Sequence, residues 1–279
     1  MASLRVSATQ FDIRKIETPD DFWARVEALI KQAGAEDSQL ILFPEYFALP
    51  WLLSLHNQNF EKALDGFDDV KTQYHSRFQE LAKQYQLIIV AGSVPVFMRV
   101  RRVNRCFTYL PDGRKFEQDK QNMTRFENEK WNVSAGHPNI RFWEWKGAGL
   151  GVAICYDIEF PAYTKELTKK DADLILVPSC TGDIHGYWRV RHCSQARAVE
   201  SQTYVVMSSL VGGNPALPDL DTLYGRAGLF TPCDVDFPEE GVLGLGAINE
   251  EGVITKSLDI KLLHKVRVEG TVLNRRDIF

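Results

Sequence analysis

Short apolar runs alternate along this chain with longer stretches in which apolar residues recur every three or four positions. The short runs are typical of buried strands, and the longer stretches are typical of helices with one buried face. Their alternation predicts a layered α/β fold in which helices pack on sheets. The predicted strands cover residues 4–9, 40–43, 87–92, 150–154, 174–177, 204–208, 228–231, 243–248 and 254–258.

The predicted helices lie between these strands. Thr18 is a typical N-cap residue and Pro19 suits the first helical position, so we expect a helix to begin there. Residues 105–120 depart from the α/β rhythm, because a Pro-Asp-Gly turn joins two strands in the manner of a hairpin. The other expected helices cover residues 70–85, a stretch after Tyr163, and residues 188–202.

Length and composition favour one enzyme-like domain. The 279 residues contain no linker, repeat or charge block that would divide them, so we expect a single domain over residues 1–279. A net charge of −4, with 44% hydrophobic and 25% charged residues, gives no electrostatic reason to expect a nucleic acid as partner. The basic alternation in residues 98–105 fits a half-solvated strand better than a phosphate site.

The length of the apolar runs and the number and spacing of the cysteines bear on the cellular location of the protein. No apolar run approaches the roughly 18 residues needed to span a membrane, and the first residues lack a secretory pattern. The five cysteines are odd in number and contain no CxxC pair, which favours free thiols in a reducing environment. We therefore expect a cytoplasmic protein with no membrane partner.

Three reactive side chains each follow a predicted strand. Cys155 ends the strand within GVAICYDIEFP, Glu45 follows the strand at 40–43, and Lys120 closes the hairpin. In open α/β sheets, active-site residues gather beyond the carboxyl ends of strands. A nucleophilic thiolate needs a base and a positively charged neighbour, and the other two residues could supply them.

Glu45, Lys120 and Cys155 in this order resemble the nitrilase superfamily of carbon–nitrogen hydrolases. That resemblance implies a four-layer αββα sandwich of two mixed sheets. It also implies a small-molecule amide substrate and a homodimer or higher homo-oligomer. Residues 260–279 form a C-terminal extension that ends in alternating apolar and basic residues, and we expect it to pack on a partner subunit. The motifs that carry the resemblance are FPEYF (43–47), PDG (111–113) followed by the lysine, CYDIEFP (155–161), VPS (177–179), QARAVESQ (195–202) and YGRAG (224–228).

The resemblance also implies catalytic roles. Cys155 would attack the carbonyl carbon, Glu45 would act as base and then acid, and Lys120 with the backbone N–H of Tyr156 would stabilise the oxyanion. Members of the superfamily commonly carry a second glutamate after the lysine. Its distance from Gly136 favours Glu129 over Glu127, in a role that orients the lysine or the attacking water.

The substrate pocket is expected to form from loops at residues 46–59, 131–139 and 181–188. These loops are rich in aromatic residues, which predicts a narrow and partly apolar pocket. The expected lining residues are Tyr46, Trp131, Tyr156, Cys180 and Thr181.

Other chemistries fit the sequence less well. The spacing of His185, His192 and Cys193 matches no familiar metal site, and neither a dinucleotide fingerprint nor a Walker motif is present, so we expect no metal and no cofactor. The leading function is an amidase that acts on a small linear carboxamide. An N-carbamoyl amide hydrolase and a nitrilase are the nearest alternatives, and a catalytically inactive scaffold of the same fold is the alternative of another class.

Overall fold

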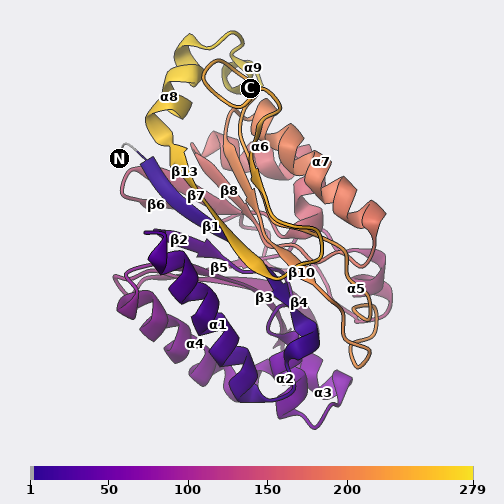
Figure 1. Cartoon of the computed structure of the whole chain (residues 1–279). Helices are drawn as coiled ribbons and strands as arrows, with labels where there is room; N and C mark the ends of the chain where they lie inside the picture. The colour runs from indigo at the N-terminus through magenta and orange to yellow at the C-terminus, as the bar shows by residue number, and fades with distance from the viewer. Residues whose placement is uncertain (1–2, 279) are drawn as a thin grey trace.

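Two mixed β-sheets pack face to face between layers of helices in the computed structural model, which describes residues 3–278 (Figure 1). The first sheet has the order β10 (Ser209–Val211), β1 (Ser3–Asp12), β2 (Leu40–Leu42), β3 (Ile88–Met98), β4 (Arg101–Tyr109) and β5 (Lys115–Asp119), with β13 (Gly252–Asp259) also paired to β1. The second has the order β12 (Val242–Leu245), β11 (Gly228–Phe230), β9 (Tyr204–Met207), β8 (Leu174–Val177), β7 (Ala148–Val152) and β6 (Phe142–Trp145).

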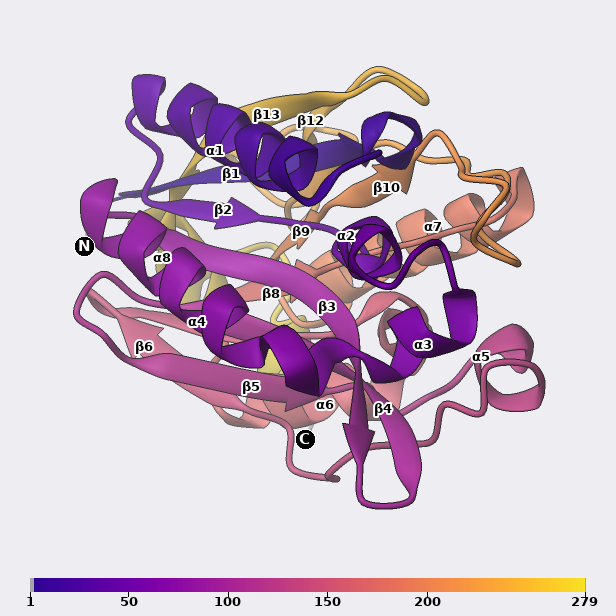
Figure 2. The same cartoon turned by 90° about the horizontal axis from the view of Figure 1, so that it is seen from below.

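The helices cover the outer faces of the two sheets. α1 (Pro19–Ala35) and α4 (Phe67–Gln84) lie over the first sheet, as Figure 2 shows from below, and α6 (Pro161–Lys169) and α7 (Ile184–Glu200) lie over the second (Figure 1). The predicted four-layer αββα sandwich is therefore confirmed. Strand residues alternate between two cores, since Ile41 packs with the aromatic residues of α1 and α4 while its neighbours Leu40 and Leu42 pack in the core shared with the second sheet.

Several elements begin or end where the sequence predicted them. Thr18 caps α1 in a capping box with Asp21, and Pro19 occupies the first turn. The Pro-Asp-Gly turn joins β4 to β5, and β8 spans the predicted residues 174–177. These agreements follow from local signals that tertiary packing did not override.

Other elements differ from the prediction. The expected loop at residues 46–59 contains a buried helix, α2 (Leu49–Leu55), which is followed by α3 (Phe60–Asp65). β3 continues to Met98 through a register shift between Val90 and Ser93, where Gly92 has a φ of +52°. A Cβ atom on Gly92 would lie 1.9 Å from the carbonyl oxygen of Pro44, so this glycine marks a bulge inside the strand and not its end.

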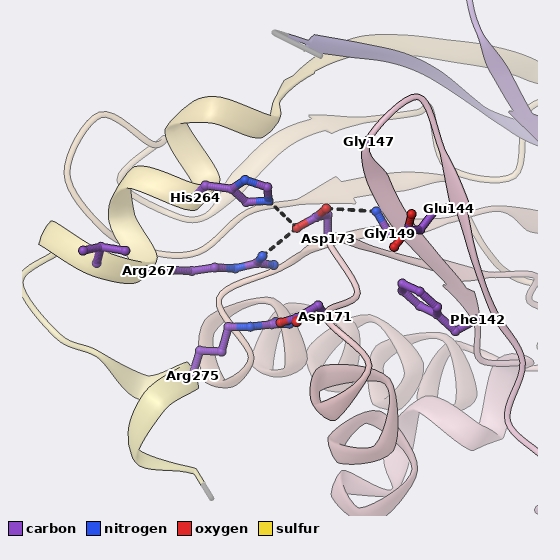
Figure 3. A pocket seen from close by; sticks show the side chains of 10 residues that line it. Phe142, Glu144, Gly147, Gly149, Asp171, Asp173, His264, Arg267 and Arg275 are labelled. Atoms are coloured by element: carbon purple, nitrogen blue, oxygen red, sulfur yellow. Dashed lines mark hydrogen bonds and ion pairs between the residues drawn. The ribbon is translucent and has the colours of Figure 1, made fainter.

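The C-terminal segment packs on its own chain. α8 (Ile260–Glu269) and α9 (Asn274–Asp277) lie beside the loop that leads into β8 (Figure 3). Arg267 donates to Asp173 at 2.6 Å, and Arg275 donates to the carbonyls of Thr168 and Ser201 at 2.9 and 3.0 Å. Packing of this segment on a partner subunit stays a prediction, as do the homo-oligomer and the single domain.

None of the helices within residues 3–278 combines the length and the apolar character needed to cross a bilayer. The cytoplasmic location stays a prediction.

Candidate active site

Cys155 lies at the start of a tight turn that follows β7. The turn is the 3-10 helix η2 (Cys155–Glu159), and the backbone N–H of Cys155 donates to Pro178 O at 2.9 Å. Cys155 has a φ of +46°, a strained conformation for a residue with a side chain, and strain of this kind gathers at functional sites. The side chain is only 3% exposed, but it reaches the wall of a cavity.

Lys120 bridges two buried carboxylates. Its Nζ lies 2.7 Å from Glu45 Oε1 and 2.6 Å from Glu127 Oε2, and all three side chains are at most 2% exposed. The three residues come from separate segments, because Glu45 follows β2, Lys120 follows β5, and Glu127 lies in the short helix α5 (Arg125–Glu129). The structure thus brings together the acid and the amine that the sequence singled out.

The structure contradicts the prediction that Glu129 is the second glutamate beside Lys120. Glu129 is exposed and pairs with Arg125 at 2.9 Å, while Glu127 occupies the place against Lys120. The reason is the start of α5, where Glu127 Oε2 accepts from the backbone N–H of Thr124 at 2.9 Å and from its hydroxyl at 2.7 Å. This capping box is visible in the sequence as Thr-x-x-Glu, and it would have identified Glu127.

Two residues that the sequence analysis missed or misplaced hold the carboxylates. Asn104 Nδ2 donates to Glu45 Oε1 at 2.8 Å and to Glu127 Oε1 at 3.1 Å. The hydroxyl of Tyr46 donates to Glu127 Oε1 at 2.8 Å. No motif marked Asn104, because a buried asparagine inside a strand has no local sequence signature.

The cluster gives its two carboxyl groups different pKa values. Burial raises the pKa of Glu45 to about 7, and the charge of Lys120 only partly opposes this. Burial also acts on Glu127, but the ammonium of Lys120 and the hydrogen bonds from Lys120 and Thr124 lower its pKa. Pairs of carboxyl groups whose environments separate their pKa values commonly divide acid–base work between them.

Lys120 keeps its positive charge in this cluster. Burial favours the neutral amine, yet Glu127 and Glu45 outweigh it and raise the pKa of Lys120. A fixed cation in a buried site stabilises negative charge that develops during a reaction.

The thiol of Cys155 is neutral at rest. Burial and the charge of Glu45 raise its pKa, and Lys120 opposes them. The adjacent thiol in turn opposes the rise in the pKa of Glu45. Because Glu45 Oε1 already accepts from Lys120 and Asn104, Oε2 is the oxygen left to take the thiol proton.

Asp157 fastens the cysteine turn to the segment after Lys120. The carboxylate accepts from the backbone N–H of Asn122 at 2.8 Å and from its side chain at 2.9 Å. Burial raises the pKa of Asp157 to about 6, and these hydrogen bonds partly oppose the shift. The sequence analysis assigned Asp157 no role, although it occupies the turn directly after Cys155.

A cavity of about 860 Å³ opens above Cys155. Tyr156, Cys180 and Thr181 line it, in the places expected of them. The carbonyl of Cys180 accepts from the Cys155 thiol at 3.5 Å. The backbone N–H of Tyr156 lies in the first turn of η2, where N–H groups have no partner within the helix, so it is available to an oxyanion.

Tyr46 and Trp131 do not line this cavity, contrary to the prediction. Both are fully buried, and their rings pack edge to face at 5.2 Å between centroids. They act behind the wall of the cavity. Tyr46 donates to Glu127, and Trp131 packs against the ring of Tyr46.

The expected loop at residues 181–188 is mostly the first turn of α7. Asp183 caps this helix by accepting from the backbone N–H of Gly186 at 2.7 Å. The end of the helix and not a flexible loop therefore forms this wall of the cavity.

The family model for carbon–nitrogen hydrolases matches residues 5–264. The chain belongs to the carbon–nitrogen hydrolase family, as its motifs predicted.

Individual relatives cover almost the whole chain. The probable hydrolase YhcX of Bacillus subtilis is 34% identical over 99% of this chain, which spans 54% of that protein's length. Omega-amidase NIT2 of Danio rerio is 26% identical over 99% of this chain and 95% of its own. Among solved structures, a cysteine-to-alanine mutant of the amidase from Nesterenkonia sp. AN1 in complex with butyramide has a TM-score of 0.74 at 20% identity, covering 96% of each chain.

Proposed function

We propose that the protein hydrolyses the C–N bond of a small linear carboxamide through a thioester on Cys155, releasing ammonia and a carboxylic acid. The observation that carries this proposal is the bridge from Lys120 to Glu45 and Glu127 beside a thiol that faces a cavity. An amidase that binds butyramide shares the fold, which supports a small amide as substrate.

The first half of the reaction forms the thioester. Glu45 takes the thiol proton as sulfur bonds to the carbonyl carbon, and the carbonyl oxygen becomes an oxyanion beside Lys120 and the N–H of Tyr156. The tetrahedral intermediate then collapses. Its C–N bond breaks as Glu45 passes the proton to the leaving nitrogen, which departs as ammonia.

Water completes the cycle. Glu45 takes a proton from the water as its oxygen attacks the thioester carbon, and the proton then goes to the departing sulfur of Cys155. A carboxyl group with a pKa near neutrality can accept and donate in this way at each step. Glu127 stays ionised and keeps Lys120 charged and in place throughout.

A panel of substrates tests the reaction class. Ammonia release is measured from pentanamide, from an N-carbamoyl amine and from pentanenitrile, with the acyl-enzyme sought by intact mass. Faster release from the amide, with an acyl adduct on Cys155, supports the proposal. Preference for the carbamoyl compound or the nitrile supports the alternative reactions instead.

Two cysteine variants control for the nucleophile. Cys155→Ala should abolish ammonia release, while Cys233→Ala, which changes an exposed thiol, should retain it. Full activity of Cys155→Ala would exclude the proposed mechanism. Inactivity of the wild-type enzyme toward the whole panel would favour the inactive scaffold.

A further inference from the structure

Charged residues surround the cavity above Cys155, and most of them neutralise one another. Ion pairs join Arg125 to Glu129, Lys130 to Asp219, and Arg189 to Glu159. Each pair contributes no net charge to the rim.

Two further carboxylates on the rim leave it negative. Asp183 and Asp221 line the same cavity, and neither forms an ion pair with another residue of the described chain. The cavity therefore has two more acidic than basic lining residues. A negatively charged cleft attracts cations and repels anions.

Glu159 is the carboxylate best placed to contact a substrate. It lies in η2, in the same turn as Cys155, and its side chain is only 16% exposed. Its single ion pair, to Arg189 Nε, is long at 3.7 Å, and the side chain of Arg189 is 60% exposed. No hydrogen bond to the carboxylate of Glu159 forms within residues 3–278.

A carboxylate in this position lacks a close donor. Burial raises the pKa of Glu159, and Arg189 and Lys120 only partly oppose the shift. A ligand with a positively charged N–H donor would supply the charge-assisted hydrogen bond that this carboxylate lacks.

We infer that the cavity selects carboxamides whose far end carries a cationic amine, and that Glu159 is the specificity-determining residue that binds this amine. The inference rests on the proposed function and narrows its substrate class. Asp183 and Asp221 add to the attraction without a fixed contact. A substrate with a carboxylate at its far end is repelled by the same groups, so the discrimination has an attractive and a repulsive part.

Three amides with the same number of carbon atoms test the inference at pH 8. 5-Aminopentanamide, pentanamide and the monoamide of glutaric acid differ in charge at the far end. We expect kcat/KM to fall in that order, with roughly a 10- to 100-fold step from the cationic to the neutral amide, the size of one charge-assisted hydrogen bond. Equal values for the cationic and neutral amides, or a preference for the anionic one, would overturn the inference.

Variants assign the preference to its residue. Glu159→Gln should reduce the ratio of kcat/KM between the cationic and neutral amides to near one, and Glu159→Lys should favour the anionic amide. Glu166→Gln, which changes an exposed carboxylate on α6, serves as a matched control and should keep the wild-type ratio. Retention of the full ratio in Glu159→Gln would show that another group binds the amine.

Binding to an inactive variant separates this inference from the proposed function. Calorimetry with Cys155→Ala measures the affinity of the three amides without turnover. Tighter binding of the cationic amide, lost on adding Glu159→Gln, supports the inference even if the wild-type enzyme hydrolyses none of them. Hydrolysis of all three with equal affinities would leave the proposed function standing and exclude the selectivity.

Discussion

The side-chain nitrogen of Asn104 lies 2.8 Å from Glu45 Oε1, the same oxygen that accepts from Lys120. A neutral donor and a charged donor thus fix one oxygen of the candidate base and leave the other oxygen for the thiol. The hydrogen bond also favours the ionised form of Glu45, because the amide donates to the carboxylate.

Replacing Asn104 should therefore shift the pH dependence of the enzyme as well as slow it. In Asn104→Ala, loss of a hydrogen bond worth about 0.5–1.5 kcal/mol should raise the pKa of Glu45 by up to about one unit. The acidic limb of kcat/KM against pH should move upward by that amount. A lower rate with an unmoved limb would mean that Asn104 only supports the fold.

The pH dependence of the wild-type enzyme should follow Glu45 and not the thiol. The pKa of Glu45 is raised to about 7, while that of Cys155 lies well above its usual range, so the base must lose its proton before the thiol can react. We expect the inactivation of Cys155 by iodoacetamide to rise with pH through a midpoint near 7. The assay uses a Cys233→Ser background, because that cysteine is exposed. A midpoint above 9 would contradict the assignment of Glu45 as base.

The same carboxyl group should affect stability in the opposite direction. Its pKa is higher in the folded chain than the ordinary value of 4.5, so its contribution favours the folded state fully below about pH 4.5. That contribution is lost as the pH rises through about 7. Activity and this part of the stability are thus expected to change in opposite senses over the same range.

Both the charge and the compact shape of the Lys120 ammonium should be required for activity. In Lys120→Met, two buried carboxylates would lose their cation, and breaking a buried ion pair typically costs about 3–5 kcal/mol. Lys120→Arg keeps the charge but brings a planar fork into a site built for a compact ammonium. We expect both variants to lose ammonia release, with the larger loss of unfolding free energy in Lys120→Met, as measured by urea denaturation. Near wild-type turnover in either would contradict the proposed oxyanion role.

Glu127 and Glu129 form a matched pair for the second glutamate. Glu127→Gln removes a buried charge that holds Lys120, so kcat/KM should fall by at least about 100-fold, the size of a lost preorganised contact. Glu129→Gln breaks an exposed ion pair worth about 0–1 kcal/mol, and its kcat/KM should stay within about twofold of wild type. A large loss in Glu129→Gln with little change in Glu127→Gln would instead identify Glu129 as the second glutamate.

This pair also shows what the sequence could and could not predict. The three reactive residues stand at strand ends, and strand ends are local signals, so Glu45, Lys120 and Cys155 could be singled out from the chain alone. Which of two neighbouring glutamates faces inward depends on the rotation of a single helical turn. Only the capping box at Thr124 carries that information, and spacing from Gly136 does not.

The remaining differences have physical causes of the same kind. Gly92 suggested the end of a strand, but the strand continues through a bulge because the paired strand β4 supplies hydrogen bonds beyond it. The sequence predicted a loop over residues 181–188, but the cap by Asp183 starts α7 at Ile184. Asn104 acts through partners 59 and 23 positions away, and contacts at such separations have no periodic signature.

The C-terminal helices offer a prediction about stability that is independent of the active site. Arg267 donates to Asp173 at 2.6 Å, and that carboxylate is only 5% exposed, so Arg267→Met would leave a buried charge with fewer partners (Figure 3). A cost of roughly 3–5 kcal/mol should lower Tm by roughly 6–15 °C in differential scanning calorimetry. Arg276→Met is the control, because Arg276 pairs with Asp277 at an exposed site and should change Tm little.

Arg267→Met should lower stability without affecting catalysis. Figure 1 places α8 and α9 away from α5, whose residues line the cavity, so kcat/KM of Arg267→Met at 25 °C should match the wild type while Tm falls. An unchanged Tm would show that α8 is held by its apolar contacts alone, through Leu263 and Val266, which are buried in its inner face. A fall in kcat/KM at a temperature where the variant is fully folded would instead show that the anchor of α8 is coupled to the geometry around Cys155, and would contradict the independence expected here.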